Sequence, residues 1–384
     1  MSAEAEARAR VRDARRVVVK VGSSSLTTVE GGLDHDRVRR IASALGAHRA
    51  GGREVILVSS GAIAAGLEPM GLDRRPRDLA TQQAAAGVGQ SLLMAAYTFG
   101  LRDYGLVPAQ VLLTADDLIR RTHYRNAQRA LDRMISLGMM PVVNENDAVA
   151  THEIRFGDND RLAALVAHLA HADALILLSD VEALLTAPPE RAGSQRVSFV
   201  SGPGDLEALS IGGIGAAGIG SGGMVTKVQA ATMAADSGIP TILTSTPHIE
   251  DALRGGERGT AFGITHRRRA TRLLWLAHLA RTMGTVTIDD GAVRAVSRRG
   301  TSLLAVGVTG VSGDFEAGDP VDVRGTDGTL VARGIVNFSA EELPQMCGMS
   351  SEELGDRLGA DYRREVIHRN DLVLTEAVFE KAEI

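Results

Sequence analysis

One sequence pattern constrains the fold most: short, continuous runs of β-branched and aliphatic residues, each followed by a longer segment with helical spacing. The clearest runs occupy residues 17–19, 55–58, 141–143, 175–178 and 240–243. Continuous rather than alternating apolar runs are typical of strands buried on both faces of a parallel sheet. Helical spacing between them is clearest at residues 36–50, 82–100 and 161–171. The sequence therefore predicts an α/β fold with an open, mostly parallel sheet sandwiched by helices.

The pattern changes near residue 275. Residues 265–281 contain five arginines, no acid and the only tryptophan of the chain, which indicates a basic linker or a connecting helix. From residue 285 onward, short strand-like runs alternate with turns such as Asp289-Asp290-Gly291, a pattern that predicts a small β-rich barrel. We therefore expect two domains, residues 1–274 and residues 275–384, the second including the linker.

Charge and cysteine content exclude several classes of protein. The formal net charge of −5 gives no sign of a polyanionic partner, so nucleic acid is an unlikely main ligand. The single cysteine, Cys347, rules out an internal disulfide framework and a multi-cysteine metal site, as expected in a reducing compartment. Residues 1–16 form a charged lead-in without the apolar core of a signal peptide, and no apolar run approaches membrane-spanning length. We expect a cytoplasmic protein without a membrane segment.

Lysine is rare in this sequence, and two of its three lysines lie next to glycine-containing loops. Only Lys20, Lys227 and Lys381 are lysines among 42 basic residues. Lys20 ends the first predicted strand and precedes a Gly/Ser loop, which favours a phosphate cradle, although a lysine beside an ordinary turn is the alternative. Lys227 follows a glycine-rich segment, residues 212–223, at the start of a predicted helix. Neither the dinucleotide fingerprint nor the P-loop fits that segment, so we interpret it as a loop around a triphosphate, with an exposed linker as the alternative.

Small polar residues follow the other predicted strands, where ligands bind in open α/β sheets. These residues are Ser59-Ser60-Gly61, Asn144-Glu145-Asn146-Asp147 and Ser179-Asp180, and Gly157-Asp158-Asn159-Asp160 precedes a helical segment. Each group alone is also compatible with turns and helix caps. Together they can hold an ammonium group and a magnesium nucleotide. His168 and His171 lack a third ligand nearby, and we assign no residue as a metal ligand.

In combination, these motifs resemble the amino-acid kinase family. The matching segments are residues 18–23, 58–66, 143–150, 156–160 and 220–227, and residues 287–292 resemble the start of the PUA domain found in many bacterial members. The resemblance implies the fold predicted above with a PUA-like C-terminal domain. It also implies ATP-dependent phosphorylation of the γ-carboxylate of L-glutamate to L-glutamyl 5-phosphate, the first step of proline biosynthesis, with ATP and Mg²⁺ required.

The resemblance also implies roles for individual residues. Lys20 and Lys227 match the lysines that contact the ATP phosphates, and Asp160 matches the acid that orients them. The glutamate-binding positions correspond to Ser60, Asp147 and Asn159. Positions that bind ATP correspond to Lys20, Ser179, Asp180, Ser221, Gly222, Gly223, Met224, Val225, Thr226 and Lys227. The sequence departs from the family pattern at residues 183–189, which read Ala-Leu-Leu-Thr-Ala-Pro-Pro.

Partners and alternatives follow from the same resemblance. It implies feedback inhibition by proline and a homo-oligomer, either a dimer or a tetramer. Relatives of this fold phosphorylate other small carboxylate or carbamate acceptors, and PUA domains elsewhere bind RNA, so both remain alternatives. Residues 284–384 hold 18 acids and 10 bases, and this excess of acids opposes RNA binding.

Overall fold

The computed structural model describes residues 2–28, 32–114, 117–118, 121–149, 159–187, 191, 193–207, 223–264, 282–299 and 301–374. The basic segment 265–281 and most of the glycine-rich segment lie outside these residues. The chain divides into two compact units, residues 1–271 and 272–384. Each unit is described by itself.

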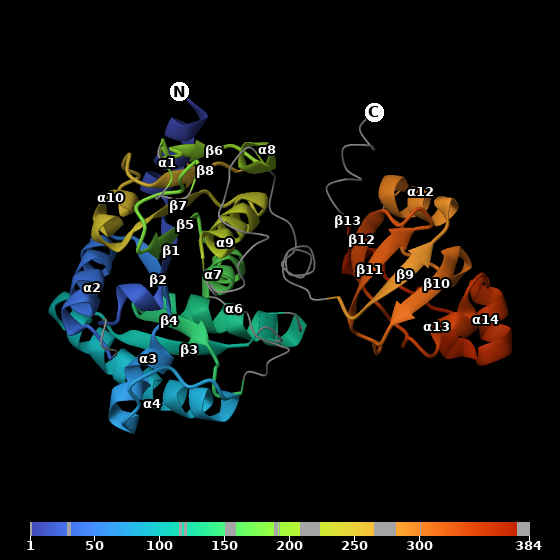
Figure 1. Ribbon diagram of the computed structural model, residues 1–384, viewed down its shortest axis with the longest axis horizontal. Helices are drawn as coiled ribbons and strands as arrows, with labels where there is room; N and C mark the ends of the chain where they lie inside the picture. The colour runs from blue at the N-terminus through green and yellow to red at the C-terminus, as the bar shows by residue number, and fades with distance from the viewer. Residues whose placement is uncertain are drawn as a thin grey trace. The chain divides into compact units, whose positions relative to one another are not determined.

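The first unit is built around a sheet of eight described strands (Figure 1). In spatial order the strands are β3 (Pro108–Leu113), β4 (Met140–Glu145), β2 (Glu54–Ser59), β1 (Arg16–Val21), β5 (Ala174–Ser179), β7 (Thr241–Ser245), β8 (Thr260–Phe262) and β6 (Phe199–Val200). All neighbouring pairs are parallel except β7 and β8. The five predicted strands are confirmed, and with them the open, mostly parallel sheet. β6 and β8 are too short to leave a run that could be recognised in the sequence.

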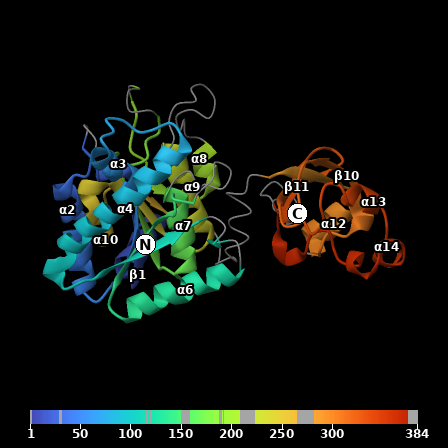
Figure 2. The same ribbon diagram turned by 90° about the horizontal axis from the view of Figure 1, so that it is seen from below.

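Helices cover both faces of this sheet. Figure 2 shows α2 (His35–Ala50), α4 (Leu79–Leu101) and α10 (Ile249–Leu253) on one side, and α6 (Arg121–Ser136), α7 (Asn159–Leu169) and α9 (Met224–Asp236) on the other. The shorter helices are α1 (Ala3–Asp13), α3 (Ala62–Leu67) and α8 (Pro203–Glu207). The strands β1, β2 and β5 are almost fully buried, as their continuous apolar runs require.

Helix α4 and the turn after it, Leu79–Tyr104, are apolar and long enough to cross a membrane by length and composition alone. In the fold, this helix packs against α2, α3 and β3. Leu93, Tyr97 and Leu101 lie on its inner face and are fully buried in the main core. Packing within the unit therefore explains the apolar residues of its inner face, whereas Val88, Leu92 and Phe99 on the same helix are exposed.

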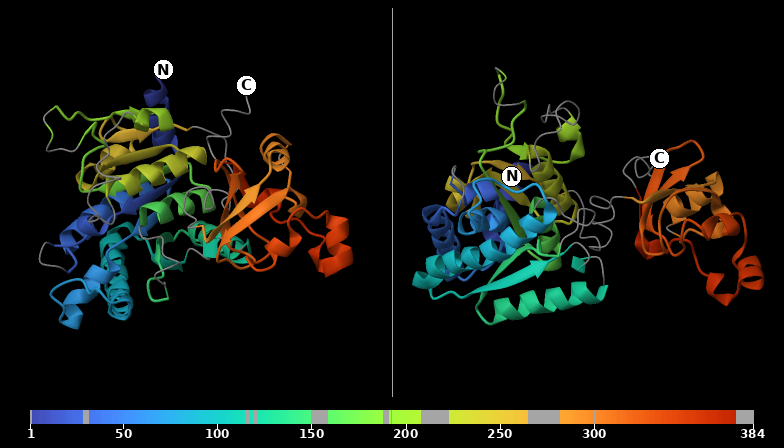
Figure 3. Two further views of the ribbon diagram at one scale, coloured as in Figure 1. Left: turned by 45° about the vertical axis from the view of Figure 1, so that its right-hand side comes forward. Right: turned by 60° about the horizontal axis from the view of Figure 1, so that its bottom comes forward.

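The second unit contains a separate sheet of five described strands and its own core. The strand order is β10 (Val308–Gly313), β9 (Gly284–Ile288), β11 (Pro320–Gly325), β12 (Leu330–Ile335) and β13 (Leu372–Leu374), with only β9 and β11 parallel. Figure 3 shows this unit in orange to red. Its helices are α12 (Asp290–Arg299), α13 (Leu343–Met346) and α14 (Ser351–Leu358), and each contributes apolar side chains to the core. The prediction of a smaller β-rich unit is confirmed.

Candidate active site

Polar side chains from several strands meet at one edge of the large sheet. The parallel strands β1, β2, β4 and β5 all present their carboxyl ends there, which is where open α/β sheets bind ligands. A cavity of about 890 Å³ opens at this edge, a size suited to small molecules. Its polar lining includes Lys20, Ser60, Asn144, Glu145, Asp147, Asn159, Ser179, Asp180 and Lys227. Sequence positions far apart in the chain therefore converge on one site.

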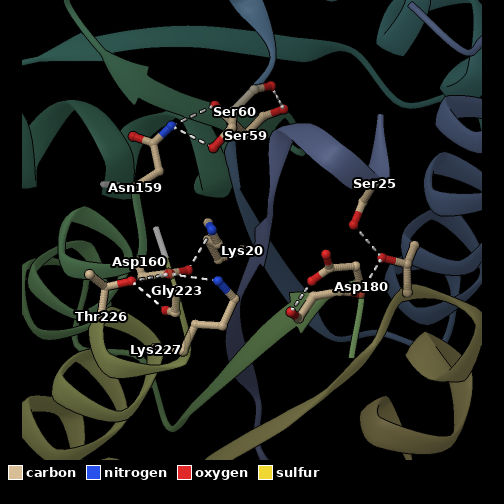
Figure 4. A network of polar contacts seen from close by, with 12 residues as sticks. Lys20, Ser25, Ser59, Ser60, Asn159, Asp160, Asp180, Gly223, Thr226 and Lys227 are labelled. Atoms are coloured by element: carbon tan, nitrogen blue, oxygen red, sulfur yellow. Dashed lines mark hydrogen bonds and ion pairs between the residues drawn. The ribbon is translucent and has the colours of Figure 1, made fainter. Parts of the chain in front are cut away.

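Two lysines and one carboxylate form the centre of this site (Figure 4). Lys20 lies on β1, Asp160 in the first turn of α7, and Lys227 in the first turn of α9. Asp160 Oδ1 forms an ion pair with Lys20, and Asp160 Oδ2 lies 3.3 Å from Lys227 Nζ. Thr226 Oγ1 donates a hydrogen bond to Asp160 Oδ2 at 3.2 Å. One carboxylate thus contacts two ammonium groups that are far apart in the sequence.

All three charged side chains of this cluster are buried, so each of them must keep a partner of opposite charge. The Asp160 side chain is completely buried, and the side chains of Lys20 and Lys227 are 4% and 11% exposed. A buried charge is tolerated only when it is paired, because desolvation costs several kcal/mol for each ion. Two ammonium groups meet at one carboxylate here, at the edge of the cavity. Such a cluster is suited to a polyanionic ligand.

A second group of polar contacts lies on the other side of Lys20 (Figure 4). Asn159 Nδ2 donates hydrogen bonds to Ser60 Oγ and to Asn144 Oδ1, both at 2.9 Å. Asn144 Nδ2 in turn donates to Gln90 Oε1 on α4 at 2.9 Å. The chain of amides fixes the start of α7 against the end of β2.

The turn after β2 depends on one glycine. Gly61 has φ 98°, a left-handed conformation that side chains rarely adopt, and it allows β2 to turn directly into α3. Before it, Ser59 Oγ shares a hydrogen bond of 2.8 Å with the hydroxyl of Tyr97. Burial raises the pKa of Tyr97, so that hydroxyl stays neutral. Ser60 is thereby held at the cavity wall.

The remaining predicted positions are placed as follows. Ser179 ends β5 and donates to Asp180 Oδ1 at 2.9 Å, and Asp147 lies in the turn after β4; all three line the cavity. Gly223 is the N-cap of α9, and Met224, Val225 and Thr226 are its first residues; Gly223 and Thr226 lie near the two lysines (Figure 4). Ser221, Gly222 and Asp158 lie outside the described residues.

The cavity suits a magnesium nucleotide in its donor chemistry. Lys20, Lys227 and the N-terminus of α9 supply positive charge and backbone N–H groups for phosphate. Carboxylates are the oxygen donors that Mg²⁺ prefers, usually together with substrate phosphates and water. The described residues contain no cluster of three acidic, histidine or cysteine side chains, so phosphate and water oxygens would hold most of the Mg²⁺, with Asp180 at the proposed nucleotide end as a carboxylate donor. Both groups therefore fit the residues present.

Sequence reasoning missed several residues of the cavity wall. Arg75, Arg77 and Gln82 line it from the segment between α3 and α4, and Gln90 supports it from within α4. None of them follows a predicted strand. The Arg-Arg-Pro-Arg run at residues 74–77 was the available signal, because it places guanidinium groups just before a helix in an α/β repeat.

Comparison with known proteins agrees with this geometry. Residues 15–245 match the amino acid kinase family, and residues 284–357 match the PUA domain. The chain belongs to the amino acid kinase family.

Within the amino acid kinase family, this chain is similar in sequence to proteins named glutamate 5-kinase. Glutamate 5-kinase from Streptomyces coelicolor is 58% identical over 370 residues, covering 96% of this chain and 99% of that protein. Glutamate 5-kinase from Thermobifida fusca is 56% identical over 370 residues, covering 96% and 95%. Among solved structures, carbamate kinase from Giardia lamblia bound to AMP-PNP aligns with a TM-score of 0.49 and 18% identity, covering 66% of this chain and all of that one.

Proposed function

We propose that this chain is a kinase that transfers the γ-phosphoryl group of ATP to the γ-carboxylate of L-glutamate. The products are ADP and L-glutamyl 5-phosphate, and the reaction is the first step of proline biosynthesis. The observation that carries the chemistry is the buried Lys20–Asp160–Lys227 cluster at the cavity. The choice of acceptor is supported by the near-full-length identity to glutamate 5-kinases.

The reaction needs little covalent help from the protein. A carboxylate is ionised at neutral pH and is already a nucleophile, so no general base is required. A γ-carboxylate oxygen attacks the γ-phosphorus as the bond to the ADP oxygen breaks. Catalysis then consists of holding the two substrates in line and stabilising charge on the transferring group.

Lys20 and Lys227 have the charge that such stabilisation requires. In our account their ammonium groups contact the phosphate oxygens and stabilise the negative charge of the transferring phosphoryl group. Asp160 is a positioning residue that fixes both lysines before substrates bind. Preorganisation of this kind lowers the cost of rearrangement during the reaction.

The two ends of the cavity bind different substrates in this proposal. Glutamate binds near Ser60, Asp147 and Asn159, and in this proposal the Asp147 carboxylate contacts the α-ammonium group. ATP binds beside Lys20 and Lys227, with its other contacts from Ser179, Asp180 and residues 221–226. Mg²⁺ would be held by the ATP phosphates and the cavity acids, directly or through water, and would supply further charge neutralisation.

We further propose a cytoplasmic homo-oligomer, a dimer or a tetramer, that proline inhibits. These properties rest on the family resemblance and, for the compartment, on the single cysteine. The excess of acids in residues 284–384 disfavours RNA as a ligand of the PUA domain. A role in regulation or assembly fits that domain better.

An acceptor panel tests the proposed reaction. ADP release would be measured with glutamate, aspartate, N-acetylglutamate, carbamate and UMP, each with and without proline. We expect glutamate to give the highest kcat/KM and proline to reduce its rate. Preference for any other acceptor would overturn the assignment.

A further inference from the structure

Two arginines line the cavity without a place in the mechanism above. Arg75 and Arg77 belong to the segment 71–78 between α3 and α4, and both are exposed. Within the described part of the chain, neither guanidinium group makes a hydrogen bond or an ion pair with the protein. Together with Lys20 and Lys227 they are the cationic side chains among the described lining residues.

The segment that carries them is firmly anchored. Helices α3 and α4 are in backbone contact, because a Cβ atom at Gly66 would lie 2.0 Å from the Ala85 carbonyl oxygen and one at Gly89 would lie 1.8 Å from the Ala62 carbonyl oxygen. These glycines tie the start of α4 to the helix that follows Ser60. The two helices that flank the arginine segment are therefore fixed relative to each other, next to the proposed glutamate end of the cavity.

Local hydrogen bonds fix the loop itself. Gln82 Nε2 donates to the Pro76 carbonyl oxygen at 2.9 Å, and Asp78 caps α4 by accepting from the Thr81 amide at 2.8 Å. Pro76 restricts the backbone between the two arginines. The guanidinium groups are the unpaired part of an otherwise well-connected loop.

The charged groups of glutamate indicate which ligand the two arginines bind. Glutamate carries a reacting γ-carboxylate, an α-ammonium group and an α-carboxylate. The proposed function assigns the two lysines to the reacting end and Asp147 to the ammonium group, which leaves the α-carboxylate without an assigned cation. Arginine is well suited to a carboxylate because its planar fork matches both oxygens.

We propose that Arg75 and Arg77 bind the α-carboxylate of glutamate and make the site specific for acceptors that carry a free one. This inference rests on the proposed function and adds specificity residues to it. An alternative ligand for the same guanidinium groups is a phosphate of ATP. Loss of the arginines would raise KM for glutamate in the first case and KM for ATP in the second.

The test compares Arg75→Gln, Arg77→Gln and the double variant with Arg74→Gln. Arg74 is an exposed arginine of the same loop that does not line the cavity, so its variant is the matched control. Loss of charge-assisted hydrogen bonds should raise KM for glutamate about 10- to 100-fold in the double variant. We expect kcat and KM for ATP to stay near wild type, and the control to behave like wild type.

A second readout separates specificity from a general structural defect. Wild-type enzyme should prefer glutamate strongly over its α-amide, isoglutamine, and the double variant should lose most of that preference. Unchanged KM for glutamate with unchanged preference would overturn the inference, and so would a rise confined to KM for ATP. Wild-type inactivity with glutamate would instead overturn the proposed function and this inference with it.

Discussion

Each unit of the protein buries a carboxylate between two cations, but the cations are buried in one unit and partly exposed in the other. Asp160 is fully buried, and its partners Lys20 and Lys227 are buried with it at the cavity. Asp322 on β11 is 8% exposed, but its partners Arg324 and Arg333 have side chains 39% and 29% exposed. In the C-terminal unit, the cations keep contact with water.

A buried carboxylate alone therefore does not mark an active site. Arg324 and Arg333 lie on β11 and β12, which pair with each other, so the Asp322 contacts stabilise neighbouring strands. The Asp160 contacts join a strand to two helices at the sheet edge and place two cations at a cavity. Desolvated cations beside an accessible cavity are the functional signature.

Removing either lysine should give the largest effect. We expect Lys20→Ala and Lys227→Ala each to lower kcat by about 1,000-fold or more, because each loses a cation next to the transferring phosphoryl group. Asp160 keeps the other lysine as a partner, so circular dichroism should show a folded protein. Turnover near the wild-type rate in either variant would contradict the proposed chemistry.

Neutralising the central carboxylate should have the next largest effect on activity. Asp160→Asn leaves two buried ammonium groups without their shared partner, which should cost about 3 kcal/mol of unfolding free energy. The loss of lysine positioning should lower kcat about 100-fold in the molecules that remain folded. Full kcat combined with reduced stability would make Asp160 purely structural.

Exchanging lysine for arginine should have a smaller effect. Lys20→Arg and Lys227→Arg keep the charge but replace a compact ammonium group with a planar fork, and we expect kcat to fall about 10- to 100-fold. The near absence of lysine elsewhere in a chain that otherwise uses arginine motivates this test. If both variants kept full activity, the choice of lysine over arginine at these two positions would have no chemical meaning.

The smallest effect on catalysis is expected in the C-terminal unit. Asp322→Asn makes the same chemical change as Asp160→Asn and serves as its matched control. It should cost about 1–2 kcal/mol of unfolding free energy, seen in thermal unfolding, because two charge-assisted hydrogen bonds are weakened. kcat should stay at the wild-type value, and a fall as large as that of Asp160→Asn would remove the contrast between the two regions.

Much of the site could be predicted from the sequence because parallel strands leave local signals. Lys20, Ser60, Asp147 and Asp180 all follow apolar runs, and the carboxyl ends of parallel strands share one edge. Their convergence on one cavity follows from that rule. These site residues are therefore positioned mainly by the parallel strands of the sheet.

The parts that could not be predicted depend on long-range packing. Arg75 and Arg77 reach the cavity because α3 and α4 touch at two glycines, a contact that no local pattern reveals. Residues 1–16 were predicted only as a charged lead-in, yet residues 3–13 form α1. Arg8 of that helix is buried and donates to main-chain carbonyls of Ser198 and Arg258, far along the chain.

An isotope-transfer experiment tests most directly whether the carboxylate of glutamate accepts the phosphoryl group. The enzyme would be given ATP, glutamate labelled with ¹⁸O in its γ-carboxylate, and hydroxylamine. Hydroxylamine attacks the acyl carbon of the product, forms γ-glutamyl hydroxamate, and releases phosphate with the bridging oxygen. We predict one ¹⁸O atom in each phosphate so released. Hydroxamate formation with unlabelled phosphate, or no hydroxamate at all, would contradict attack by the γ-carboxylate.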